Sequence, residues 1–133
     1  MRAWQKFWRQ DGHLAAAGFA YREAGPHLML MAFLQRLVNG GGRIHREFAV
    51  GSGRADLVVS WRQWRYVLEL KIRYGEHSQQ EGIEQLSGYL DRLGEREGYL
   101  LLFDRRKDTR WADKLFEAEA SSGGEQKVHI LGM

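Results

Sequence analysis

The sequence predicts an α/β protein in which helices flank a mixed central sheet, and two patterns support this class. In two segments, 21–39 and 81–93, apolar residues recur at steps of three and four, which is the spacing of one helix face. Shorter runs rich in β-branched and aliphatic residues have the length of strands: 43–50, 53–60, 65–72 and 98–103. The expected order is helix, three strands, helix, strand (α-β-β-β-α-β), followed by a C-terminal β-hairpin. The second helix is a crossover, so the strands on either side of it pair in parallel beside an antiparallel hairpin.

The whole chain, residues 1–133, is expected to form a single domain, because this length is enough to bury one core. Residues 1–19 extend the domain at its N-terminus as a short helix followed by a loop rich in Gly and Ala. Three aromatic residues stand at helical spacing in this helix, and we expect them to dock on the domain: Trp4, Phe7 and Trp8. Basic residues lie between them, so an aromatic and basic contact to nucleic acid is the alternative.

The composition is that of an ordinary globular chain, and it excludes several classes of protein. There is no Cys, so neither a disulfide framework nor thiolate chemistry is available, and a reducing cytoplasm is the expected compartment. No apolar run reaches the length of a membrane span, so no membrane partner is expected. The net charge of +3 permits nucleic-acid binding without requiring it.

The first long helix, predicted over 21–39, carries a candidate site residue near its start. Pro26 suits the first turn of a helix better than its interior. The helix can therefore begin as late as Ala24 rather than at residue 21. Glu23 falls in line with His27 and with the apolar stripe, and a carboxylate on that side needs a partner. The alternative for Glu23 is a residue favoured by the helix dipole. We interpret His27 as a helix-end or groove residue rather than a ligand.

The central feature of the chain is a hairpin formed by the second and third predicted strands. In the third strand the apolar residues alternate with Glu69 and Lys71, which therefore share one face. If residues 61–64 form a four-residue loop, the register places Asp56 directly across from Glu69. Facing residues have Cβ atoms roughly 4.5–5.5 Å apart. Two carboxylates that close repel each other, so a sheet has no structural use for them unless a cation lies between them.

Two carboxylates and a lysine on adjacent strands are typical of a metal-dependent phosphodiesterase. Mg²⁺ is a hard cation that keeps several waters and needs few protein oxygens, so the pair suits it. The metal lowers the pKa of a bound water and neutralises charge on the phosphate. Lys71 can orient that water or stabilise developing negative charge. The alternative is an exposed strand face on which Lys71 forms a salt bridge with Asp56 or Glu69.

The second long helix, 81–93, offers two further candidates. Gln85 and Tyr89 are four residues apart beside its apolar stripe, so both can face the same partner. A Gln amide and a Tyr hydroxyl both suit a phosphate or a metal-bound water. The alternative is a boundary pair that covers the edge of the core.

Several of these residues also resemble a known nuclease motif. Ala55-Asp56 followed by Glu69-Leu70-Lys71 resembles the core motif of the PD-(D/E)XK nuclease superfamily, with Ala55 in place of the usual Pro. The run from Gln85 to Tyr89 is similar to the Gln-x-x-x-Tyr motif of the RecB-like branch. Over residues 21–133 the chain resembles the C-terminal nuclease domain of certain prokaryotic AAA-type ATPases. This likeness is carried by three segments: 40–43, 53–56 and 93–106.

The resemblance implies a restriction-endonuclease-like core and a Mg²⁺ site, in which Mn²⁺ can substitute. Asp56 and Glu69 would bind the metal directly. The backbone carbonyl of Leu70 is expected, as in relatives, to complete the coordination, and Glu23 matches an acidic residue of the first helix that acts through a water.

The resemblance also implies the reaction and the partners. The expected function is hydrolysis of phosphodiester bonds in DNA, with Lys71 positioning the attacking water and with Gln85 and Tyr89 orienting substrate or water. The alternative is a catalytically weak, nuclease-like module that binds nucleic acid or protein. A homodimer and an association with a larger ATPase are both compatible with the sequence. Whether the substrate is DNA or RNA, single- or double-stranded, and cut internally or from an end stays open.

Overall fold

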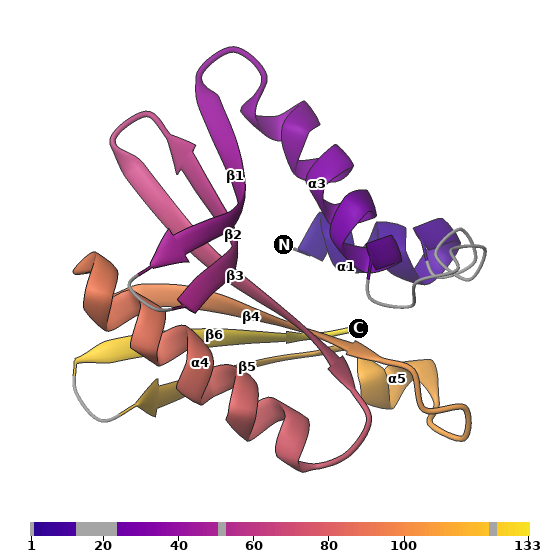
Figure 1. The fold of residues 1–133 in the computed structure, drawn as a ribbon. Coiled ribbons are helices and arrows are strands. Elements are labelled where there is room, and N and C mark those ends of the chain that lie inside the picture. Colours follow the sequence, from indigo (N-terminus) through magenta and orange to yellow (C-terminus); the bar gives the residue numbers. More distant parts are fainter. Residues whose placement is uncertain (1, 13–23, 51–52, 123–124) are drawn as a thin grey trace.

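A computed structural model describes residues 2–12, 24–50, 53–122 and 125–133 (Figure 1). The elements follow in the expected order, with short helical segments added: α1 (Arg2–Phe7), the π-helical turn η1 (Trp8–Gly12), α3 (Ala24–Val38), β1 (Gly42–Val50), β2 (Gly53–Trp61), β3 (Trp64–Arg73), α4 (His77–Leu93), β4 (Glu97–Asp104), α5 (Trp111–Lys114), β5 (Phe116–Ser122) and β6 (Gln126–Gly132). The predicted α/β class is confirmed.

The six strands form one mixed sheet in the order β1-β2-β3-β4-β6-β5. The first three strands are antiparallel neighbours, and α4 crosses over so that β4 pairs with β3 in parallel. The C-terminal hairpin does not stand apart, because β6 joins the sheet parallel to β4. The sequence indicated the hairpin but gave no sign of this pairing.

Helices cover both faces of the sheet (Figure 1). The sheet therefore separates the core into two clusters. The α3-side cluster includes Leu68, Leu70 and Ile72 of β3 together with side chains of α1 and α3. The α4-side cluster includes Val67 of β3 and Leu86 of α4. The predicted alternation along β3 is therefore confirmed, and it follows from the two-residue side-chain period of a strand.

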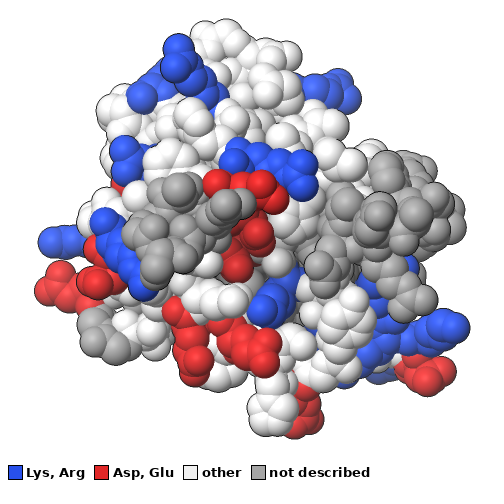
Figure 2. Space-filling model, in the orientation of Figure 1, with Lys and Arg blue, Asp and Glu red and all other residues white. Residues whose placement is uncertain are grey.

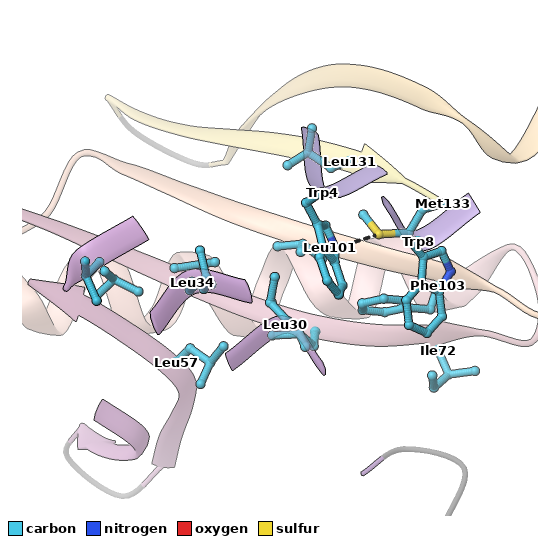
Figure 3. Close-up of a cluster of buried hydrophobic side chains, with 14 residues drawn as sticks. Trp4, Trp8, Leu30, Leu34, Leu57, Ile72, Leu101, Phe103, Leu131 and Met133 are labelled. Carbon is cyan, nitrogen blue, oxygen red and sulfur yellow. Dashed lines mark hydrogen bonds between the residues drawn. The ribbon is translucent and has the colours of Figure 1, made fainter. Parts of the chain in front are cut away.

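The N-terminal helix docks on the α3-side cluster, as expected. Trp4 is completely buried and Trp8 is 5% exposed. The indole Nε1 of Trp4 donates a hydrogen bond to Sδ of Met133 over 3.1 Å, as Figure 3 shows. The Gln5 amide donates to the carbonyl of Gly132 over 2.9 Å. The burial of both indoles excludes the alternative in which they contact nucleic acid.

Among the boundaries that differ from the predicted ones, two lie in α4 and in the central hairpin. Helix α4 begins at His77, before the predicted start at residue 81; its first turn is polar and carries no apolar stripe, so the periodicity did not reveal it. Its end is as expected, and Gly94 takes a left-handed conformation with φ of 67° that favours glycine. The loop of the central hairpin has two residues rather than four, because Trp61 pairs with Trp64 and Arg62 turns the chain with φ of 54°.

Candidate metal centre

The centre forms where the ladder between β2 and β3 stops. The pairing is regular from the hairpin loop down to Leu57 opposite Leu68, as the predicted register requires. Beyond that pair, the backbone N–H of Leu70 donates its hydrogen bond to Oδ2 of Asp56 over 2.8 Å. The carboxylate thus takes the place that a backbone carbonyl of β2 would have in a continued ladder. Asp56 is thus held against β3 by its side chain.

The neighbouring strand β1 is distorted at the same level. Its pairing with β2 is regular on either side of Glu47, and that residue has a φ of 50°, a conformation that costs a non-glycine residue about 1 kcal/mol or more. Side-chain alternation breaks here, because Ile44 packs in the α3-side cluster while Phe48 packs in the α4-side cluster. At this level the side chains of both strands therefore change from one face of the sheet to the other. The alternating pattern of the sequence did not predict this change.

Glu69 lies on the α4 side of the sheet and is only 6% exposed. Its Oε2 atom is buried and has no hydrogen-bond partner among the residues that the structure describes. Burial, and then the negative charge of Asp56, raise the pKa of Glu69 to about 8, although a hydrogen bond from the Asp56 backbone and the charge of Lys71 act in the opposite direction. The two carboxylates therefore interact closely, although the predicted pairing of Asp56 with Glu69 is not part of the ladder, which stops at Leu57 and Leu68.

The same environment raises the pKa of Asp56. Burial is the main cause, and the charge of Glu47 adds to it. The hydrogen bond from Leu70 and the charges of His27 and Lys71 lower the pKa. The Nε2 atom of His27 lies 3.9 Å from Oδ2 of Asp56, so this residue belongs to the centre more closely than its helix-end position indicated.

Lys71 is held by α4. Its Nζ donates a hydrogen bond to Oε1 of Gln85 over 3.0 Å and lies 3.6 Å from Oε2 of Glu81. The exposed-face alternative required a salt bridge between Lys71 and Asp56 or Glu69. The ion pair that forms is instead with Glu81. Sequence reasoning missed Glu81, although its spacing of four residues from Gln85 puts both on one side of the helix.

These side chains line a cleft of about 760 Å³ between α3, the bend in β1 and β2, and the start of α4. Its wall includes His27, Glu47, Asp56, Glu69, Leu70, Lys71, Glu81 and Gln85, together with Arg46. In Figure 2 acidic and basic side chains lie next to one another near the middle of the molecule.

Two predicted site residues are not part of the cleft wall as described. Tyr89 packs against the α4-side cluster, one helical turn beyond Gln85. Glu23 lies outside the described residues. The structure therefore brings together Asp56, Glu69, Leu70, Lys71 and Gln85 of the predicted set.

The donor atoms of the cleft fit a small, hard cation. Carboxylate and carbonyl oxygens are the ligands that Mg²⁺ takes, and one or two carboxylates are enough because the ion keeps several waters. Within the described ranges no group of three or more His, Asp or Glu side chains is close enough to hold a metal. The buried, unpartnered oxygen of Glu69 is the atom that a bound cation would satisfy.

Comparisons with known proteins add no assignment: no family model, no curated protein and no solved structure matches the chain. Among the described helices, none is long and apolar enough to cross a membrane.

Proposed function

We propose that the protein is a Mg²⁺-dependent nuclease that hydrolyses phosphodiester bonds of DNA, built on a restriction-endonuclease-like core of the PD-(D/E)XK type. One observation carries the proposal. Glu69 is buried beside a second carboxylate, Asp56, and one of its oxygens has no partner among the described residues. Burying like charges destabilises a fold unless a proton or a cation compensates them.

The ion would be held by Asp56, Glu69 and the backbone carbonyl of Leu70. His27 is close enough to Asp56 to help orient its carboxylate. Mn²⁺ would fit the same oxygen donors. When bound, Mg²⁺ supplies charge neutralisation at the scissile phosphate and an acidified water.

Three side chains of the protein have roles beside the ion. The raised pKa of Glu69 means that its carboxyl holds a proton at neutral pH, and that proton must leave when the carboxylate becomes a ligand. Lys71 stabilises negative charge that develops on the phosphate, which requires its ammonium group to point into the cleft. Gln85 holds that ammonium group by a hydrogen bond and so limits where it can go.

The test is cleavage of supercoiled plasmid and of labelled single strands in Mg²⁺ and in Mn²⁺. The wild type should nick DNA, and Lys71→Met should be slower by about 10²–10³, since one such contact contributes that much. Asp56→Asn should be inactive. Glu84→Gln is the matched control, because Glu84 is an exposed carboxylate of α4 that pairs with Gln80 and does not line the cleft.

Two results would count against the nuclease. Undiminished cleavage by Lys71→Met and Asp56→Asn would place the chemistry elsewhere. A wild type that binds nucleic acid but cleaves none of it with either metal would favour the binding module that the sequence left as the alternative.

A further inference from the structure

A basic surface leads along the sheet to the candidate metal centre. The register places Arg43 of β1, Ser60 of β2 and Arg65 of β3 directly beside one another in one row across three strands. The next row toward the centre is His45, Val58 and Val67. Residues that are direct neighbours across a ladder share a face, and so do residues two apart along a strand.

Both rows lie on the α4 side of the sheet. Val58 and Val67 belong to the α4-side cluster, which fixes the face of their row. Arg43 and Arg65 are two residues further along the same strands, so they share that face. In the other direction, two residues beyond Val67, the same face carries Glu69.

The basic side chains of this surface are open to solvent. Arg43, His45 and Arg65 are all exposed. Arg65 is paired only at the surface, since its Nη1 lies 3.5 Å from Oε1 of Glu95. Such exposed pairs are weak, so this guanidinium group can exchange its carboxylate for a phosphate.

The distance from the basic row to the carboxylates suits a strand of nucleic acid. Four residues of a β-strand separate Arg65 from Glu69, which is about 13 Å at roughly 3.3 Å per residue. A polyanion cannot be drawn to the carboxylates themselves, because their charge repels phosphate. Guanidinium groups at a fixed distance on the same face supply the missing attraction, and arginine binds phosphate through two parallel hydrogen bonds.

We propose that Arg43 and Arg65, with His45 between them and the centre, form the phosphate-binding surface that holds a nucleic-acid strand leading into the cleft. The partner of this surface is a phosphodiester backbone. That the bound strand leads toward the cleft rests on the proposed nuclease function. The strand runs over the α4-side face of β1, β2 and β3, from the tip of the central hairpin toward Asp56 and Glu69.

The test is the affinity of a fluorescently labelled single-stranded oligonucleotide, measured by anisotropy in EDTA so that nothing is cleaved. The Arg43→Gln/Arg65→Gln variant should bind about tenfold more weakly near physiological salt, because each lost contact to a single strand lowers the salt slope by about 0.7. The slope of log affinity against log salt should therefore fall by about 1.4.

Arg2→Gln is the matched control. Arg2 is an equally removable charge, 89% exposed, and it pairs with Glu117 on α1's side of the sheet. Its loss should change the affinity by less than about twofold, since it lies off the proposed path. Glu95→Gln should strengthen binding, because it frees Arg65 from its carboxylate. The arginine variants should unfold at the wild-type temperature, since the replaced side chains are exposed.

The outcomes separate this surface from the catalytic proposal. If the double variant loses affinity while the wild type cleaves no DNA, the surface stands and the nuclease fails. If the wild type cleaves and the double variant binds like the Arg2→Gln control, the nuclease stands and the surface is refuted. A duplex titrated in parallel shows which form of nucleic acid uses the surface, and a loss with either form supports it. A wild type that binds neither form refutes it.

Discussion

Replacing Glu69 by Gln should change how stability depends on pH in the metal-free protein. The carboxyl is buried, and its pKa is raised from 4.5 to about 8 in the folded chain. Between those two values the folded protein keeps a proton that the unfolded chain has released. Glutamine has nearly the same shape, can accept the hydrogen bond from the Asp56 backbone, and cannot ionise.

The sign and size of the effect follow from proton linkage. Because the folded state binds the additional proton, the contribution of Glu69 to stability is full below about pH 4.5 and is lost as the pH rises toward 8. The loss is at most about 1.4 kcal/mol per pH unit within this window. Between pH 5.5 and 7.5 the wild type should therefore lose about 2–3 kcal/mol relative to Glu69→Gln.

Urea denaturation in EDTA at several pH values in this window measures the effect. All other titrating groups are shared, so the difference between the two proteins reports the ionisation of Glu69 together with its interaction with Asp56. The control is Glu84→Gln, which should follow the wild type because Glu84 is exposed on α4. Parallel curves for wild type and Glu69→Gln would refute the reasoning, because they would mean that Glu69 ionises normally in the folded protein.

Two more predictions concern the centre and the core. Binding of Mn²⁺ near pH 7 should release close to one proton, because the Glu69 carboxyl must lose its proton to become a ligand. Calorimetry in two buffers of different ionisation enthalpy measures this release, and equal heats in both buffers would contradict it. Trp4→Ala should lower the free energy of unfolding by about 3–5 kcal/mol, since it empties a completely buried site. Trp64→Ala, at a 60% exposed position, should change it by less than about 0.5 kcal/mol, and similar losses in both variants would refute the docking of α1.

The sequence was sufficient for the central hairpin because its periodicity is strong. Leu68, Leu70 and Ile72 alternate without a break, so only one face of β3 could enter the α3-side cluster. The change of face in β1 and β2 was not predictable in the same way. It depends on the φ of Glu47 and on the bond from the Leu70 backbone to Asp56, neither of which leaves a mark on the hydrophobic pattern.

The candidate site was predictable as far as spacing carries information. Lys71 and Gln85 were each predicted as site residues, and they contact each other because one lies on the α4 face of β3 and the other on α4. Tyr89 is one helical turn further on, about 6 Å along the axis, and that displacement takes it from the cleft to the core cluster. His27 comes from α3, and no local pattern connects that helix with Asp56.

The bond between Trp4 and Met133 has a consequence for the order of folding. It joins residues 129 positions apart, and α1 has only six residues, which is too short for a stable helix by itself. Contacts between such distant segments form slowly, because the chain entropy of closing the loop must be overcome first. The N-terminal helix can therefore be secured only after β6 has entered the sheet beside β4. During refolding, the burial of Trp4 would report the completion of the whole sheet rather than the formation of any one part.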